Sequence, residues 1–182
     1  MYTVNAELLA RLDIPPGILI GRTALVTGGA RGIGEGAALT MAHLGARIVV
    51  VDIRPSGRHV VEAIAEQGGQ AKYIECDLSD VDQLMAMLPE AEAAFGPIDI
   101  LLNNALYLHA APVVEFGLDE WDKTFDTNAR APFLMIIVAP PESSAVICAD
   151  PSFLRDPRLN ITPAQGVIAI SGFDDNGRLS AA

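Results

Sequence analysis

Cysteine is scarce in this chain, which has only Cys76 and Cys148 among its 182 residues. Two thiols are too few for a disulfide framework and their spacing fits no metal motif, so two buried free thiols are the simplest interpretation. Basic residues are also scarce, since 12 lysines and arginines stand against 23 acidic residues, for a net charge of −11. This balance argues against nucleic acid and against an anionic membrane surface as partners.

Long apolar runs are missing as well. The apolar stretch 131–138 is followed by Pro140-Pro141 and is far shorter than the roughly 18 residues of a membrane span. Residues 1–13 carry acidic side chains and no long apolar core, unlike a signal peptide, so we expect a cytoplasmic protein. Hydrophobic residues nevertheless make up 51% of the chain, which suits a single folded domain with a real core.

Strand and helix patterns alternate along most of the chain. Short apolar segments predict strands at Thr23–Thr27, Arg47–Val51, Ala71–Glu75 and Ile98–Leu102, with a short strand at Val146–Cys148 and a better one at Gly166–Ile170. Helical spacing predicts helices at 7–12, 36–44, 57–67, 80–95 and 118–134, the fourth interrupted or ended near Pro89. The alternation predicts an α/β fold, a doubly wound parallel sheet with right-handed crossovers and helices on both faces. Residues 1–20 form an N-terminal extension to it.

The most informative local feature is the run Thr27-Gly28-Gly29-Ala30-Arg31-Gly32-Ile33-Gly34 between the first strand and the next helix. Glycine at Gly28, Gly32 and Gly34 permits a tight turn and a close approach of backbone to ligand. The helix that follows offers free N–H groups and a partial positive charge at its N-terminus. The run therefore predicts a phosphate-binding turn.

Asp52 stands at the end of the second predicted strand. A carboxylate there can accept hydrogen bonds from both hydroxyls of an adenosine ribose and repels a 2′-phosphate, which favours NAD over NADP. Arg31 argues the other way, because a basic side chain beside the phosphates suits NADP, but repulsion at the ribose rejects the extra phosphate directly. The plainer interpretation of Asp52 is a solvated turn aspartate.

From residue 21 to residue 133 these features resemble the short-chain dehydrogenase/reductase family. The glycine run is similar to the family's cofactor signature, and Asp77-Leu78 resembles its adenine-contacting acid after the third strand. Asn103-Asn104-Ala105 resembles the Asn-Asn-Ala-Gly motif after the fourth strand, although Leu106 stands where the family has glycine. Asn128 resembles the helix asparagine that supports the family's proton relay.

The resemblance implies a Rossmann fold that binds NAD(P), with NAD the expected cofactor, and hydride transfer to or from a small alcohol or carbonyl substrate. It assigns no metal, and it makes Asn128 and Ser171 catalytic. The cofactor-binding residues that it implies are Gly28, Arg31, Gly32, Ile33, Gly34, Asp52, Ile53, Asp77, Leu78, Asn104 and Ala105.

The family's Tyr-x-x-x-Lys pair is missing from the sequence. None of the three tyrosines, Tyr2, Tyr73 and Tyr107, has a lysine four residues later. The segment Gly166–Gly172 resembles the family's fifth strand, with Ser171 at its end, and the tyrosine is expected about a dozen residues further on. We therefore expect a C-terminally incomplete fold. The proline-rich stretch 138–165 fits an insertion, a substrate-side loop or an altered reading of the gene.

Three interpretations stay open at this point. The first is an oxidoreductase that is shortened or that depends on residues supplied elsewhere. The second is a nucleotide-binding protein without catalysis, such as a sensor or an inactive partner subunit. The third is a fragment that folds poorly, because an unfinished sheet exposes an edge and apolar faces. The substrate cannot be read from the sequence, and the resemblance implies a dimer or tetramer without deciding between them.

Overall fold

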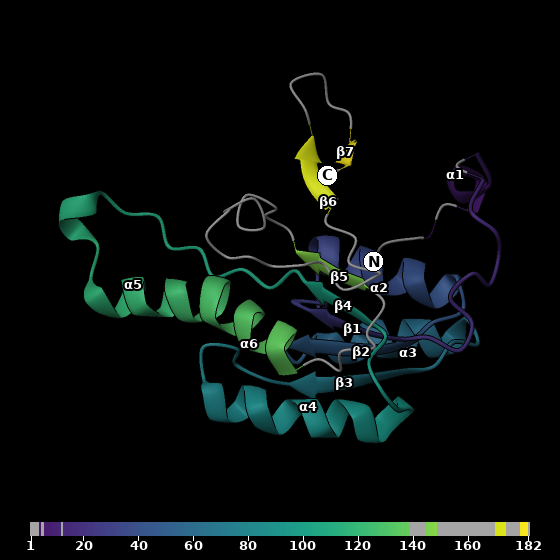
Figure 1. Cartoon of the computed structure of the whole chain (residues 1–182), viewed down its shortest axis with the longest axis horizontal. Coiled ribbons are helices and arrows are strands. Elements are labelled where there is room, and N and C mark those ends of the chain that lie inside the picture. Colours follow the sequence, from purple (N-terminus) through teal and green to yellow (C-terminus); the bar gives the residue numbers. More distant parts are fainter. Residues whose placement is uncertain are drawn as a thin grey trace.

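The computed structural model describes residue 4, residues 6–11 and 13–138, and three strands at 145–148, 170–173 and 179–181. Its centre is a five-stranded sheet in the order β3-β2-β1-β4-β5 (Figure 1). The strands are β1 (Thr23–Thr27), β2 (Arg47–Asp52), β3 (Ala71–Glu75), β4 (Ile100–Asn103) and β5 (Ala145–Cys148). All four neighbouring pairs run parallel, so the predicted parallel sheet is confirmed.

Helices cover both faces of this sheet (Figure 1). Helices α2 (Gly32–His43) and α3 (Gly57–Glu66) share one core cluster with strand residues such as Val26 and Val50. Helices α4 (Val81–Phe95) and α6 (Ala131–Val138) share the other with Leu25 and Leu101. Alternate strand residues thus enter opposite cores, which is why β1 is buried along its whole length. The doubly wound arrangement is confirmed.

The remaining elements lie outside these layers. They are α1 (Ala6–Arg11), the 3₁₀ turn η1 (Val113–Glu115), α5 (Leu118–Phe125) and the π-helical segment η2 (Asp126–Arg130), which joins α5 to α6. Leu19, in the predicted N-terminal extension, packs on the α2–α3 core. No helix in the described part of the chain has the length and apolarity needed to cross a membrane.

The helix predicted at 118–134 is divided into α5, η2 and α6 and continues to Val138, and helices α4 and α2 also depart from the prediction. Helix α4 runs unbroken past Pro89, so the predicted interruption there is wrong. The proline and Met85, whose carbonyl loses its N–H partner, both lie on the exposed side of the helix, where water can replace the missing hydrogen bond. Helix α2 begins at Gly32 rather than Gly36, so the last glycines of the motif are its first turn.

The strand beside β4 is not the one that the sequence predicts. Ala145–Cys148 takes that place, close to the short strand expected at Val146–Cys148. Residues 166–169, the first part of the expected fifth strand, lie outside the described residues, as does most of the stretch 138–165. The strand β6 (Ile170–Phe173) instead pairs antiparallel with β7 (Leu179–Ala181) in a separate two-stranded sheet. Sequence pattern alone could not choose between the two apolar segments.

Candidate cofactor site

The glycine turn lies at the carboxyl ends of the strands, next to the point where the strand order reverses between β1 and β4. Open parallel sheets bind their ligands in the crevice at this point. Gly28 has φ +64°, and a Cβ atom on it would lie 2.8 Å from the Cα of Ala105. The turn and the loop after β4 can therefore touch only because residue 28 has no side chain.

The N-terminus of α2 keeps its backbone donors available. Arg31 occupies the N-cap position in an extended conformation, and its side chain makes no capping hydrogen bond. Helix α4 differs, because the Asp80 carboxylate accepts the N–H groups of Asp82 and Gln83. A Cβ atom on Gly32 would meet nothing within 4 Å, so open space lies in front of the α2 terminus. This cradle fits a pyrophosphate.

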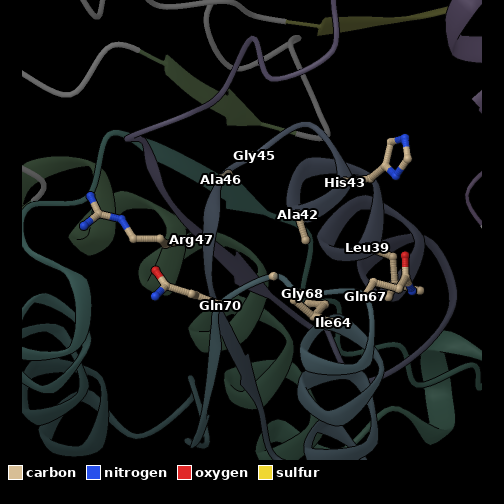
Figure 2. A pocket seen from close by; sticks show the side chains of 11 residues that line it. Leu39, Ala42, His43, Gly45, Ala46, Arg47, Ile64, Gln67, Gly68 and Gln70 are labelled. Carbon is tan, nitrogen blue, oxygen red and sulfur yellow. The ribbon is translucent and has the colours of Figure 1, made fainter.

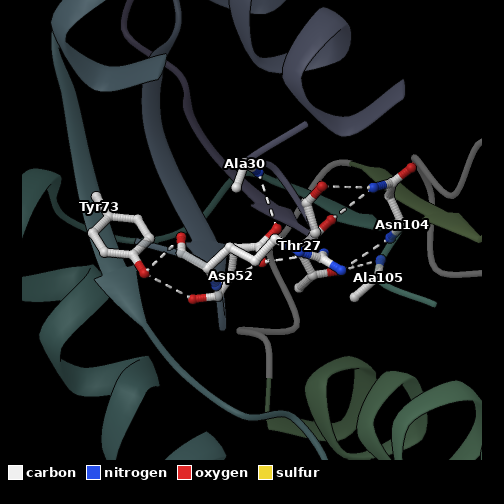
Figure 3. A network of polar contacts seen from close by, with 8 residues as sticks. Thr27, Ala30, Asp52, Tyr73, Asn104 and Ala105 are labelled. Carbon is white, nitrogen blue, oxygen red and sulfur yellow. Dashed lines mark hydrogen bonds and ion pairs between the residues drawn. The ribbon is translucent and has the colours of Figure 1, made fainter. Parts of the chain in front are cut away.

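Asp52 is tied to the glycine turn (Figure 3). Its carboxylate accepts the N–H of Ala30 at 3.0 Å and the N–H of Arg54 at 2.9 Å. With 6% of its surface exposed, Asp52 is not a solvated turn aspartate. Each carboxylate oxygen of Asp52 has a second lone pair. The two oxygens can therefore still accept hydrogen bonds from the two ribose hydroxyls. The Tyr73 hydroxyl donates to the carbonyls of Asp52 and Arg54 and holds this strand end in place.

Thr27 joins the turn to the loop after β4, a role that the sequence reasoning missed. Its buried hydroxyl donates to the Leu102 carbonyl and accepts the N–H groups of Asn104 and Ala105 (Figure 3). The Asn104 side-chain amide donates to the carbonyls of Thr27 and Gly28. A hydroxyl at the last position of a strand, directly before a glycine turn, was the available signal. Asn104 thus shapes the site through the turn.

Leu106 replaces the family's glycine without strain. Among the described residues, Asp13 is the one non-glycine residue with a positive φ, so Leu106 needs no left-handed backbone. Its side chain is largely exposed. The departure from the motif therefore changes the surface next to the site rather than the path of the chain.

The other predicted cofactor residues fall into two groups. Arg31, Ile33 and Ile53 are exposed, and the two exposed isoleucines, one in the first turn of α2 and one directly after β2, suit contact with the flat rings of a nucleotide. Leu78 is buried in the α4–α6 core. The Asp77 carboxylate accepts the N–H and the O–H of Ser79 and lies 3.9 Å from the Lys123 ammonium group.

The two predicted catalytic residues lie in different parts of the fold. Asn128 is in the π-helical segment, a form of helix that is frequent at functional sites. Its side chain accepts the Tyr107 N–H and donates to the Tyr107 carbonyl, each at 2.8 Å, so it lies against the loop after β4. Ser171 lies in β6, outside the main sheet, and its role stays a prediction.

A separate hollow of about 310 Å³ lies at the opposite end of the sheet (Figure 2). The ends of α2 and α3 line it together with the beginnings of β2 and β3. Figure 2 shows that the side chains of Arg47 and Gln70 diverge from those of His43 and Gln67. The hollow contains none of the predicted site residues. No group of three or more potential metal ligands occurs in the described ranges.

Comparison with known proteins decides the family. Residues 22–144, more than half of the chain, match the model of the short chain dehydrogenase family. The chain belongs to this family. A 2-dehydro-3-deoxy-D-gluconate 5-dehydrogenase from Pseudoalteromonas atlantica is 43% identical over 119 residues, which are 64% of this chain and 47% of that protein. The chain spans about half the length of the curated relatives that it matches.

Solved short-chain dehydrogenases share the fold. One from Burkholderia cenocepacia J2315, in complex with NADP, gives a TM-score of 0.69 at 30% identity, over 76% of this chain and 59% of that one. A metagenomic short-chain oxidoreductase, also in complex with NADP, gives 0.66 at 34% identity, over 71% and 62%. The Rossmann fold and the membership of an oxidoreductase family are therefore established for this chain.

Proposed function

We propose that this protein is an NAD-dependent oxidoreductase that transfers a hydride between NAD(H) and a small alcohol or carbonyl compound. The nicotinamide, when bound, takes up or gives the hydride. The observation that carries the proposal is the hydrogen-bonded unit of Thr27, Asp52 and Asn104, which holds the open N-terminus of α2 at the strand switch point. The substrate class comes from the dehydrogenases among the relatives.

Each part of the site has a task in this proposal. The N–H groups at the start of α2 and the space before Gly32 hold the pyrophosphate. Asp52 holds the adenosine ribose and Asp77 contacts the adenine, while the buried side chain of Leu78 fixes the backbone beside Asp77. Ile33 and Ile53 exclude water from the rings, since exposed isoleucine is stabilised by contact with them.

The preference for NAD depends on the balance of charge around the ribose. The Asp52 carboxylate is fixed by two backbone N–H groups and cannot easily turn away from a 2′-phosphate. Positive charge that could attract a 2′-phosphate is also close to the ribose site. Arg31 is exposed nearby, and the Arg54 guanidinium lies 4.0 Å from the Asp52 carboxylate. We place repulsion by the fixed carboxylate above attraction by two exposed arginines, because exposed charges are screened.

A second candidate function is nucleotide binding without catalysis. This candidate is favoured by Tyr73 and Tyr107, the two tyrosines in the described part of the chain, because both hydroxyls already donate hydrogen bonds within the protein. Burial and the charges of Glu75 and Asp52 raise the pKa of Tyr73, and the hydrogen bond to Glu120 raises the pKa of Tyr107. Neither is prepared to act as a proton acceptor near neutral pH. Asn128 and Ser171 remain the proposed catalytic residues of the first candidate.

Calorimetric titration with NAD and with NADP tests the cofactor proposal. NAD should bind more tightly than NADP, and Asp52→Asn should weaken NAD binding about tenfold or more, because hydrogen bonds to a charged acceptor contribute about 1.5–3 kcal/mol. Asp82→Ala is the matched control, since Asp82 is an exposed carboxylate in α4. Undetectable NAD binding by the unaltered chain would refute both candidate functions.

Turnover separates the two candidates. The chain lacks the Tyr-x-x-x-Lys pair, so absorbance of reduced nicotinamide should stay flat when it is mixed with NAD and a panel of sugar alcohols and secondary alcohols, and should rise once a Tyr-x-x-x-Lys segment is appended. Binding of NAD without turnover in either form supports the non-catalytic candidate instead. In the extended form, Asn128→Ala should abolish turnover and retain NAD binding, because Asn128 contacts the loop after β4 and not the glycine turn.

A further inference from the structure

The loop after β4 and helix α5 form an arm, residues 105–125, that extends beyond the carboxyl ends of the strands (Figure 1). Neither η1 nor α5 contains a buried residue. Large apolar side chains along the arm are more than two thirds exposed, namely Leu106, Leu108, Val113, Val114 and Leu118. Apolar burial therefore contributes little to holding the arm in place, and the polar contacts of the arm contribute more.

Two polar side chains of the loop converge on one carboxylate of α5. The Tyr107 hydroxyl donates a hydrogen bond to Glu120. His109 Nδ1 lies 3.6 Å from Glu120 Oε2, within the range of an ion pair when the imidazole is protonated. The His109 ring also packs edge-on against Phe116, with ring centres 5.5 Å apart. Glu120 is thus the point at which α5 and the loop are joined.

The same contacts reach both ends of the proposed active site. The Lys123 ammonium group lies 5.1 Å from the centre of the Tyr107 ring and 3.9 Å from the Asp77 carboxylate. The Asn128 side chain holds the Tyr107 backbone on the other side. A change at Glu120 therefore acts on a loop that lies between the proposed adenine acid and the proposed relay asparagine.

We propose that Glu120 is a positioning residue that holds the loop 105–112 against α5, on the substrate side of the cofactor pocket, by accepting the Tyr107 hydroxyl and pairing with protonated His109. The substrate side of this statement rests on the proposed function. The contact itself rests on the geometry of these residues alone.

The pair of His109 and Glu120 makes the arm sensitive to pH. The His109–Glu120 pair is an ion pair only when the imidazole is protonated, and histidine is the side chain whose charge responds to pH near neutrality. The other charged groups beside this contact are Lys123, which lies over the Tyr107 ring, and Asp77, which lies 3.9 Å from the Lys123 ammonium group. The hydrogen bond to Glu120 raises the pKa of Tyr107, so its hydroxyl keeps its proton and donates throughout.

Trp121, the single tryptophan of the chain, lies next to Glu120 and reports on the arm. The centres of the Trp121 and Phe125 rings lie 4.7 Å apart, and Trp121 is about half exposed. Quenching of its fluorescence by acrylamide, measured on the full chain without ligand, should rise roughly twofold between about pH 5 and about pH 8, the effect expected of a partly exposed ion pair. A profile without this step overturns the proposal.

Variants separate the ion pair from a general structural effect. Glu120→Gln still accepts the Tyr107 hydroxyl but should lose the pH step, and so should His109→Asn. Tyr107→Phe should raise quenching at every pH and keep the step. The matched control is His59→Asn, which removes an exposed His–Glu pair of 3.2 Å in α3 and should leave the step intact. A step that survives in Glu120→Gln refutes the role of Glu120.

Titration of the same variants with NAD keeps the two proposals apart. Failure of the unaltered chain to bind NAD overturns the proposed function, while the fluorescence profile still decides the role of Glu120. Glu120→Gln should bind NAD within about twofold of the unaltered chain, because its contacts are with the arm and not with the glycine turn. A loss of about tenfold or more would move Glu120 to the cofactor site and overturn its assignment to the substrate side.

Discussion

At the scale of single residues, the site is organised by side chains that hold backbone. Thr27, Asp52, Asn104 and Asn128 each hydrogen-bond to main-chain groups of a neighbouring segment. The sequence predicted Asp52 and Asn104 as cofactor contacts and Asn128 as a catalytic residue, and it assigned no separate role to Thr27. Residue type and order in the chain reveal the motif, but the partner of each side chain depends on which strands lie side by side.

Thr27 should therefore matter for stability as well as for the site. In Thr27→Val the N–H groups of Asn104 and Ala105 lose their acceptor in a partly buried place. Unsatisfied donors cost about 1–3 kcal/mol each when buried, so we expect a loss of about 2–4 kcal/mol in the free energy of unfolding. Urea unfolding measures it. Thr27→Ser keeps the hydroxyl and should recover most of the loss, and an equal loss in both variants would contradict the role of the hydroxyl.

At the scale of elements, periodicity and turn residues predicted β1 and β3 to the residue and β2 and α3 to within one. These elements have both a clear apolar pattern and a clear stop, such as Gly68-Gly69 after α3. The errors lie where local preference and tertiary packing disagree. Pro89 disfavours a helix locally, but Leu84, Met87, Leu88 and Ala91 bury one face of α4 on both sides of it. Burial of that face outweighs one missing hydrogen bond.

Replacement of Pro89 by alanine should therefore stabilise the protein. The change restores the backbone hydrogen bond to the Met85 carbonyl and removes a clash, which together are worth about 3 kcal/mol in a helix interior, less about 1 kcal/mol for the freer unfolded chain. We expect a gain of about 1–2 kcal/mol by urea unfolding. Glu92→Ala, an exposed change in the same helix, should stay within about 0.5 kcal/mol. A loss of stability in Pro89→Ala would show that the helix needs the proline.

At the scale of the whole molecule, the negative charge of the chain bears on a thiol that is buried just after the carboxyl end of β3. Cys76 is 2% exposed in the α4–α6 core, and the next residue, Asp77, is the proposed adenine acid. Burial, followed by the charges of Asp77 and Asp80, raises the pKa of the Cys76 thiol to about 11 from its ordinary 9.0. The chain as a whole carries a net charge of −11, so a further negative charge inside it is doubly unfavourable.

The thiol makes the stability of the whole domain depend on alkaline pH. Its pKa is higher in the folded state, so the contribution is fully present below pH 9.0 and is lost as the pH rises towards about 11. Two pKa units correspond to about 2–3 kcal/mol of unfolding free energy. Cys76→Ala, less stable at neutral pH because of the cavity, should lose less between these pH values, while Tyr73 and Tyr107 titrate equally in both proteins. Urea unfolding at pH values across this range measures the difference. Parallel losses in both proteins would mean that Cys76 does not ionise before the domain unfolds.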